Sequence, residues 1–197
     1  MIDYTLPVLS YLFGSVSSAM IVCKIMGLPD PTTRGSKNPG ATNVLRLGGK
    51  KAAIITLLGD VLKGLIPMLV AGQITTDSRI LALCGLGAFL GHLFPLFFGF
   101  KGGKGVATAA GIFIGLSWQL SLILLGIWFL VAATSRYSSL AALTAAAIAP
   151  GVVFWLLQDG PFVLLACIIA VCLFWRHKAN ISRLRQGTES KISFGSK

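Results

Sequence analysis

The chain has 197 residues, of which 55% are hydrophobic and only 12% are charged, and its formal net charge is +11 at pH 7. Soluble domains are about 45–50% apolar and about 25% charged, so this composition excludes an ordinary soluble domain. The high hydrophobicity also excludes intrinsic disorder. The chain is therefore predicted to be an all-α, polytopic membrane protein.

Long apolar runs mark the predicted membrane spans. A helix needs about 20 apolar residues to cross a hydrocarbon core of about 30 Å. Five runs are clear candidates, the last of them short: 4–23, 52–71, 80–98, 138–157 and 161–175. No Lys or Arg precedes the first run, so we expect a retained span there and not a cleaved signal peptide.

The distribution of basic residues orients these spans. Residues 24–51 and residues 176–197 each contain six Lys or Arg, and the positive-inside rule places both segments in the cytoplasm. Lys101 and Lys104 follow the third run and fall on the same side. For the tail to be inside, the uncharged stretch at 106–134 must cross the membrane twice.

That uncharged stretch is predicted to form two helices, 106–116 and 118–134. The first would be about 15 Å long, too short to cross alone, so we expect a short or broken helix buried by its neighbours. The prediction is a single domain over residues 1–197 with seven transmembrane helices, the N-terminus outside and the C-terminus in the cytoplasm. The cytoplasmic active-site segments are expected at 24–51, 99–105 and 176–197.

The first cytoplasmic segment contains a turn-rich stretch at residues 30–46. Asn43 is expected to cap a short helix that Gly48 ends. The stretch supplies side-chain donors, and glycines at which a ligand can approach the backbone closely. These residues are Arg34, Gly35, Ser36, Asn38, Gly40, Thr42, Asn43 and Arg46. An ordinary linker between two spans is the alternative.

The second cytoplasmic segment is a glycine-rich loop before an apolar helix. Gly102, Gly103 and Gly105 surround Lys104. Free backbone N–H groups at a helix N-terminus, together with a lysine, form a site for an anion. The pattern is not a nucleotide-binding P-loop, because glycine follows the lysine where Ser or Thr is required. A re-entrant turn is the alternative, and His92 is expected to be a packed histidine.

The C-terminal segment carries a third polar group. His177, Asn180 and Leu184 recur at helical spacing and share one face. Gly187 suits the end of that helix, and Glu189 is the only acidic residue of the tail. A basic helix on the bilayer surface is the alternative.

Two smaller features lie within or beside the spans. Asp60 and Lys63 are three residues apart in the second span, where they can pair and so lower the cost of burial. Ser138 and Ser139 place two hydroxyls at the inner membrane surface, where serines commonly cap a helix.

Three separated segments thus return to one side of the membrane and bring many hydrogen-bond donors with few acceptors. Such donors recognise phosphate oxygens. An apolar tail can lie between the spans beside them. The sequence therefore predicts a site for a substrate of phospholipid metabolism.

At these residues the sequence resembles the bacterial acyl-phosphate:glycerol-3-phosphate acyltransferase family. The matching blocks are 35–43 with Arg46, 91–108 and 177–189. The resemblance implies a seven-span integral enzyme that acylates the 1-position of glycerol 3-phosphate, giving lysophosphatidic acid and phosphate. Lys37 departs from the family pattern, in which a small residue is expected.

The resemblance also implies a role for each matched residue. The catalytic residues would be Ser36, Arg46, Lys104, His177 and Asn180. The substrate-binding residues would be Gly35, Asn38, Gly40, Thr42, Asn43, Gly102, Gly103, Gly105, Thr108, Ser138 and Ser139. Glu189 would support the structure.

The resemblance sets the expected partners and location as well. The partners are glycerol 3-phosphate, acyl-phosphate, membrane lipid and the soluble phosphate acyltransferase that produces acyl-phosphate, with no nucleic acid. The location is the bacterial inner (plasma) membrane. The sequence contains no metal-ligand cluster, and neither a metal nor a cofactor is expected.

The residues favour direct transfer of the acyl group. Other glycerolipid acyltransferases use a His followed five positions later by an Asp, but Phe97 follows His92 and Ser182 follows His177 at that spacing. An acyl-phosphate needs less activation than a thioester, so positioning and stabilisation of leaving-group charge can suffice. Ser36 as a nucleophile is the alternative mechanism.

Two other classes of protein compete with this prediction. A small-anion membrane transporter would need polar groups along a path to the outer face, where the spans offer only Asp60 and Lys63. A non-enzymatic lipid-binding membrane protein would use the basic residues only to hold headgroups.

Overall fold

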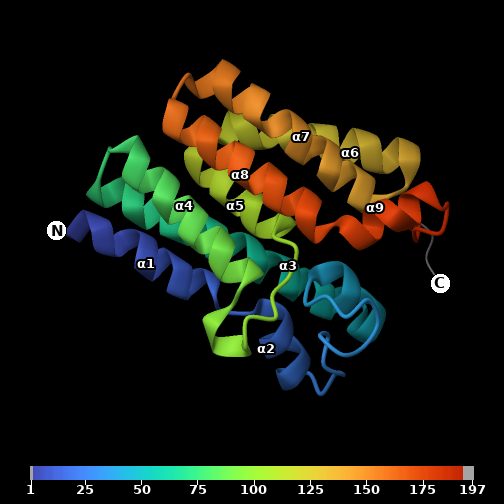
Figure 1. The fold of residues 1–197 in the computed structure, drawn as a ribbon. Coiled ribbons are helices and arrows are strands. Elements are labelled where there is room, and N and C mark those ends of the chain that lie inside the picture. Colours follow the sequence, from blue (N-terminus) through green and yellow to red (C-terminus); the bar gives the residue numbers. More distant parts are fainter. Residues whose placement is uncertain (1, 193–197) are drawn as a thin grey trace. The chain divides into compact units, whose positions relative to one another are not determined.

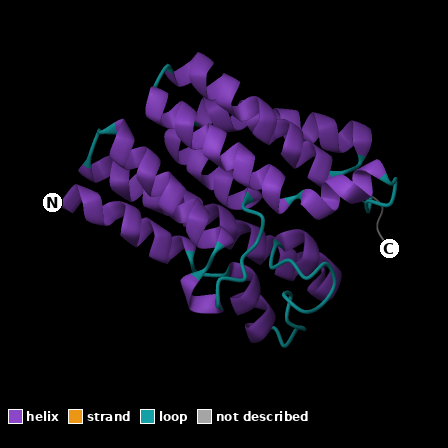
Figure 2. Cartoon of the chain, in the orientation of Figure 1, coloured by secondary structure: helices purple, strands orange, loops and turns teal. Residues whose placement is uncertain are grey.

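The computed structural model describes residues 2–192, so Lys197 of the predicted basic tail lies outside the described part. Every regular element within residues 2–192 is a helix, as predicted (Figure 2). The chain divides into two compact units, Met1–Leu116 (unit 1) and Ser117–Lys197 (unit 2).

Unit 1 contains five α-helices and one short 3-10 helix. They are α1 (Ile2–Gly14), α2 (Ser18–Ile25), α3 (Ala41–Ile74), α4 (Ser78–Leu93), η1 (Leu96–Phe98) and α5 (Val106–Leu116). Helix α1 packs against α4, and α3 packs against α5. Residues 26–40 and 94–105 lie at the same end of this unit (Figure 1), which we call the loop end.

The described part of unit 2 contains four helices: α6 (Trp118–Ser135), α7 (Ser138–Leu157), α8 (Gly160–Arg176) and α9 (Lys178–Arg185). Helix α7 packs against both α6 and α8. The chain bends by 60° between α8 and α9. After this bend the tail returns to the turn between α6 and α7, where the Ile192 N–H donates to the Arg136 carbonyl over 2.7 Å.

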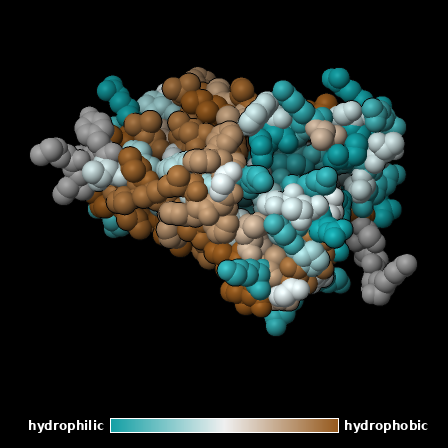
Figure 3. Space-filling view, turned by 60° about the horizontal axis from the view of Figure 1, so that its bottom comes forward, coloured by the Kyte–Doolittle hydropathy of each residue, from teal (hydrophilic) through white to brown (hydrophobic). Residues whose placement is uncertain are grey.

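Most of the predicted spans are present as helices. Within residues 2–192, five segments are long and apolar enough to cross a membrane: Thr5–Ile25, Ala41–Ile74, Ser78–Phe98, Trp118–Ser135 and Ser138–Leu157. The bent pair α8 and α9 raises the number to six if it counts as one span. Large apolar side chains remain exposed on these helices, and they colour much of the visible surface brown in Figure 3. Such a surface suits contact with lipid.

The predicted short helix at 106–116 is confirmed as α5. It has 11 residues and is therefore about 16 Å long. Its residues Ala109 and Ile112 are buried, and it packs along α3.

Two local predictions about helix ends are wrong. Helix α3 begins at Ala41 with Gly40 as its N-cap, so Asn43 lies inside the helix and does not cap it. The non-helical residue that follows this first segment is Gly49, with φ 77°, and not Gly48. The alternative role of Ser138 and Ser139 as helix caps is also not seen, because Tyr137 is the N-cap of α7.

Small residues allow the helices of unit 1 to approach closely. A Cβ atom on Gly64 would run into the carbonyl oxygen of Thr108, and one on Gly111 would run into the carbonyl oxygen of Val61. Close backbone approach at small residues is the usual way for apolar helices to associate in membranes. The close contact with α3 thus holds α5 in place, although α5 is too short to span the bilayer alone.

Gly64→Ala should destabilise the protein, because the added methyl meets backbone that cannot move aside. Overpacking of this kind costs about 1–3 kcal/mol. Gly72→Ala is the matched control in the same helix, since a Cβ there meets nothing within 4 Å. Thermal unfolding and the folded yield in detergent measure the difference. Equal unfolding midpoints for the two variants would contradict the close α3–α5 contact.

Candidate active site

Asn43 shapes the first loop of the loop end. Its side chain is buried, and its Nδ2 donates to the carbonyls of Pro31 and Arg34, both over 3.0 Å. Its Oδ1 accepts from the Ser36 backbone N–H over 2.8 Å. A Cβ on Gly35, whose φ is +62°, would meet the same Oδ1. Asn43 and Gly35 therefore fix the path of the chain into Ser36.

The second loop of the loop end lies beside the first. Hydrogen bonds from the Thr32 side chain and backbone hold the pKa of Asp30 below its usual value, and the positive charge of Lys101 lowers it further. A Cβ on Gly103 would lie 3.2 Å from the Pro39 carbonyl oxygen. The structure thus brings two of the three predicted site segments together.

The glycines around Lys104 are buried against the end of α4. A Cβ on Gly102 would meet the carbonyl oxygens of His92 and Leu93. The Gly103 N–H donates to the His92 carbonyl over 3.2 Å. Gly102 and Gly103 are therefore required for close packing, and the Gly103 amide already has a partner within the protein.

The polar side chains of the loop end differ in exposure. Ser36, Thr42 and Arg46 are exposed, whereas Lys104 is half-buried. Thr42 and Arg46 are four residues apart on the first turns of α3, so they share one face. A hydroxyl, a guanidinium and an ammonium group of this kind are suited to bind phosphate oxygens.

Other predicted substrate-binding residues lie where they contribute to helix packing or to the path of the backbone. Thr108 is fully buried in α5, where its carbonyl faces Gly64 of α3. The Gly40 N–H donates to the Asn38 carbonyl over 2.9 Å. Gly105 is buried, has a φ of +91°, and leads directly into α5.

Lys37 has a φ of 55°, in the left-handed region. A non-glycine residue pays a steric cost there. The conformation gives a physical reason for the small residue that was expected at this position.

Unit 2 gathers the residues of the tail around one carboxylate. Glu189 Oε1 accepts from Ser139 Oγ over 2.7 Å and from Asn180 Nδ2 over 2.6 Å. Its Oε2 lies 2.6 Å from Arg183 Nε, and the carboxylate side chain is 8% exposed. Arg183 was not among the predicted site residues. A basic residue six positions before Glu189 is the sequence feature that could have identified Arg183 as the partner of this carboxylate.

His177 stands at the junction of α8 and α9. It ends α8, is buried, and its Nδ1 lies 2.8 Å from the Leu173 carbonyl oxygen. Asn180 follows one turn later and is also buried, in agreement with the predicted shared face. Helix α9 ends at Arg185 with Gln186 as its C-cap, and Gly187 follows in the left-handed region with a φ of +70°. The Thr188 N–H donates back to the Arg183 carbonyl, so Gly187 closes the helix end, one residue after the C-cap itself.

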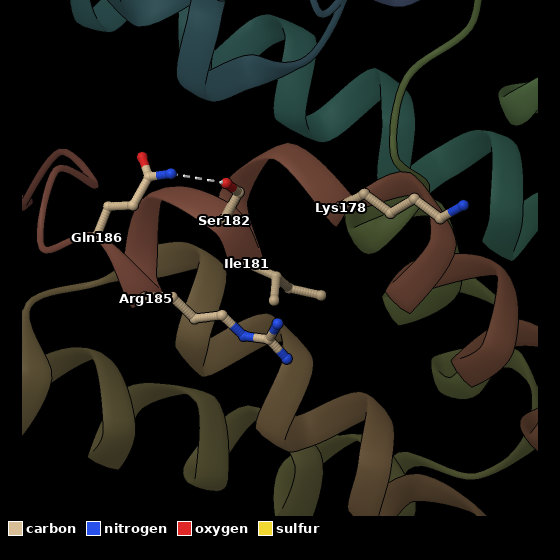
Figure 4. Close-up of a pocket in the computed structure, with 5 residues that line it drawn as sticks. All are labelled: Lys178, Ile181, Ser182, Arg185 and Gln186. Carbon is tan, nitrogen blue, oxygen red and sulfur yellow. Dashed lines mark hydrogen bonds between the residues drawn. The ribbon is translucent and has the colours of Figure 1, made fainter.

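The opposite side of α9 presents an open basic surface. Figure 4 shows a pocket lined by Lys178, Ile181, Ser182, Arg185 and Gln186. Gln186 Nε2 donates to Ser182 Oγ over 3.3 Å. The lining residues other than Ile181 are exposed, whereas His177 and Asn180 are buried. The pocket is therefore a different surface from the predicted site.

The environment of Glu189 makes the stability of unit 2 dependent on pH. Burial raises the pKa of the Glu189 carboxyl, but hydrogen bonds from Ser139, Asn180 and Arg183 and the charge of Arg183 outweigh it. The net pKa is lower than usual. A lowered pKa in the folded state stabilises the fold above the unfolded pKa of about 4.3, and this contribution is lost as pH falls through the folded pKa.

Glu189→Gln should lower the unfolding midpoint at neutral pH by about 3 °C or more, because hydrogen bonds to a charged group are lost. The variant should also lose less stability than the wild type on acidification below about pH 5. Gln186→Ala, in the same segment but exposed, is the control. Thermal unfolding across pH measures both effects, and parallel curves for wild type and Glu189→Gln would contradict the structural role.

The described residues offer donors for anions and no evident metal site. Among residues 2–192, no group of three or more His, Cys, Asp or Glu is placed to hold a metal ion. The loop end offers Ser36, Arg46 and Lys104, and unit 2 offers a buried His177 and Asn180. Such groups are suited to binding and orienting phosphate esters.

Comparison with known proteins identifies the family. A family model described as glycerol-3-phosphate acyltransferase matches residues 4–187. The glycerol-3-phosphate acyltransferase of Methylococcus capsulatus is 52% identical over 191 residues, covering 97% of this chain and 96% of that protein. That of Thioalkalivibrio sulfidiphilus is 54% identical over 183 residues, covering 93% and 90%.

Solved structures agree with the sequence relatives. The crystal structure of PlsY, an integral membrane glycerol 3-phosphate acyltransferase, in its glycerol 3-phosphate form has a TM-score of 0.94 and 38% identity, and covers 98% of this chain and 96% of that chain. Its lysophosphatidic acid form has a TM-score of 0.91 and 36% identity, with the same coverage. The family predicted from the sequence is confirmed, and the protein is an all-helical integral membrane protein. The chain belongs to the glycerol-3-phosphate acyltransferase family.

Proposed function

We propose that the protein transfers a fatty acyl group from an acyl-phosphate to the 1-hydroxyl of glycerol 3-phosphate. The acyl C–O bond to the donor phosphate breaks, and an ester bond to the glycerol oxygen forms. The hydroxyl proton leaves with the phosphate. The products are lysophosphatidic acid and inorganic phosphate, the first acylation of phospholipid synthesis.

One observation supports the proposal most strongly: the juxtaposition of two predicted site segments at the loop end of unit 1. There the exposed Ser36 and the half-buried Lys104 belong to loops that contact each other at Pro39 and Gly103, and the exposed Arg46 lies on the first turns of α3. The charges of Arg46 and Lys104 and the hydroxyl of Ser36 suit the phosphates of both substrates. The solved PlsY structures, named for a glycerol 3-phosphate form and a lysophosphatidic acid form, carry the expected substrate and product.

The buried, hydrogen-bonded positions of His177 and Asn180 support a role in orienting substrate. His177 and Asn180 are buried and held by α8 and by Glu189, respectively. We assign them the orientation of the glycerol 3-phosphate acceptor. Catalysis then relies on positioning and on stabilising the charge of the departing phosphate.

The membrane arrangement is part of the same proposal. The chain would cross the bacterial inner membrane seven times, with the bent pair α8–α9 and the short α5 completing the five long spans. The N-terminus would be outside. The basic loops would face the cytoplasm by the positive-inside rule, where a soluble phosphate acyltransferase would supply acyl-phosphate.

Purified protein should form lysophosphatidic acid and release phosphate when given acyl-phosphate and glycerol 3-phosphate. Acyl-CoA in place of acyl-phosphate should give little product, because no His–Asp pair at the usual spacing is present to activate a thioester donor. Phosphate release and product mass are measured in parallel. Transfer from acyl-CoA at an equal rate would contradict the proposed donor, and no transfer from either donor would favour a transporter or a lipid-binding protein.

Variants test the phosphate-binding residues in the same assay. Lys104→Ala and Arg46→Ala should each lower turnover by about 100-fold or more, as expected when a group that stabilises developing charge is removed. Lys51→Ala removes an exposed lysine of α3 and should leave turnover unchanged. Near-wild-type turnover of the first two variants, with normal expression, would contradict these roles.

A further inference from the structure

A cluster of titratable side chains is buried between the helices of unit 1. Asp60 and Lys63 of α3 form an ion pair of 2.9 Å, as predicted, and are only 3% and 5% exposed. His92 of α4 is also buried, and its Nδ1 lies 3.7 Å from Asp60 Oδ1. The proposed reaction uses none of these three side chains directly.

The cluster is anchored at the break between α1 and α2. Lys63 Nζ donates to the Val16 carbonyl over 3.0 Å, and Ser18 forms a side-chain hydrogen bond with Asp60. Val16 lies between the two helices, and α2 begins only at Ser18. A backbone carbonyl at a helix break inside a membrane needs a partner within the protein. Lys63 provides it, and Asp60 compensates the charge of Lys63.

This anchoring explains Lys63 and Asp60, but it does not explain a histidine at position 92. The ring of His92 lies directly against the glycine loop on its other side. A Cβ on Gly103 would run into His92 Nε2. The Gly103 N–H is bound to the His92 carbonyl as well, so the same residue contacts the loop through both its ring and its backbone.

The contact places His92 between the buried ion pair and the loop that carries Lys104. Gly103 immediately precedes Lys104 in the chain, and the ring of His92 limits how deeply Gly103 can settle onto α4. The position of the ring therefore determines the position of Lys104 relative to Pro39 and the first loop. A displacement of about 1 Å in a substrate-binding group can cost about 100-fold in rate.

We propose that His92 is a positioning residue: its ring faces Asp60 on one side, supports Gly103 on the other and so sets the place of Lys104 at the loop end. The ring of His92 in turn lies beside the Asp60–Lys63 ion pair, which binds the backbone at the break between α1 and α2. The inference rests on the proposed function, since it assigns Lys104 to substrate phosphate.

The two ring nitrogens of His92 can be tested separately. Asparagine places its amide nitrogen near the position of Nδ1, so His92→Asn keeps a polar group toward Asp60 but empties the space beside Gly103. Glutamine places its amide nitrogen near the position of Nε2, so His92→Gln keeps that space filled. Gly103→Ala is introduced into the wild type and into each of these variants.

Gly103→Ala should lower kcat/KM by about tenfold or more in the wild type and in His92→Gln, because the methyl group collides with an occupied site. In His92→Asn the same substitution should cost no more than about threefold, because the space is open. Activities are compared per folded protein, with folding followed by size exclusion and thermal unfolding. Ser10→Ala, which removes another buried polar group of unit 1, controls for a general loss of stability.

The outcomes separate this inference from the function on which it rests. An equal cost of Gly103→Ala in all three backgrounds, with an active wild type, would overturn the positioning role of His92. An inactive wild type with acyl-phosphate and glycerol 3-phosphate would instead overturn the proposed function. Should His92→Asn fail to fold, His92→Ser opens the same space and takes its place in the comparison.

Discussion

The structure of unit 1 depends on one constraint: inside an apolar membrane helix bundle, each polar group must find its partner within the protein. The break between α1 and α2 frees the Val16 carbonyl, and Lys63 binds it while Asp60 balances the charge. An unpaired charge at this depth costs about 2.5 kcal/mol or more. The paired cluster therefore stabilises the break in the first span, and α2 and the following loop lead from this break to the end at which Ser36 and Lys104 lie.

The glycines of the family motif serve packing as well as any ligand. Gly102 and Gly103 rest on the last turn of α4, and Gly64 and Gly111 let α5 lie against α3. A loop held in this way has little freedom to move, so the lysine that it carries is placed in advance of binding. Preorganised charge of this kind suits an enzyme whose sequence lacks the His–Asp spacing of other glycerolipid acyltransferases.

The sequence predicted the helices best where apolar runs were long and free of charge, as at 106–116 and 138–157. It did not predict that Asn43 lies inside α3, because its partners at Pro31 and Arg34 are brought to it by the fold of the loop. The contact of Arg183 with Glu189 likewise needs the turn at Gly187. The role of His92 was also hidden, since a histidine among apolar residues shows nothing of what touches its ring. The family blocks identified the polar segments, but only the structure separates residues that shape a loop from residues exposed on it.

In the proposed mechanism the site acts by holding phosphates in place, and the acyl group passes directly to the glycerol hydroxyl. Ser36 is held through its backbone by Asn43, and the ring of His92 is buried between Asp60 and Gly103. The most direct test is to quench a reaction of stoichiometric enzyme and acyl-phosphate at short times and measure the intact mass of the protein. Direct transfer predicts an unmodified chain at every time point while lysophosphatidic acid accumulates. An acyl ester on Ser36 that forms and decays as fast as product appears would contradict it.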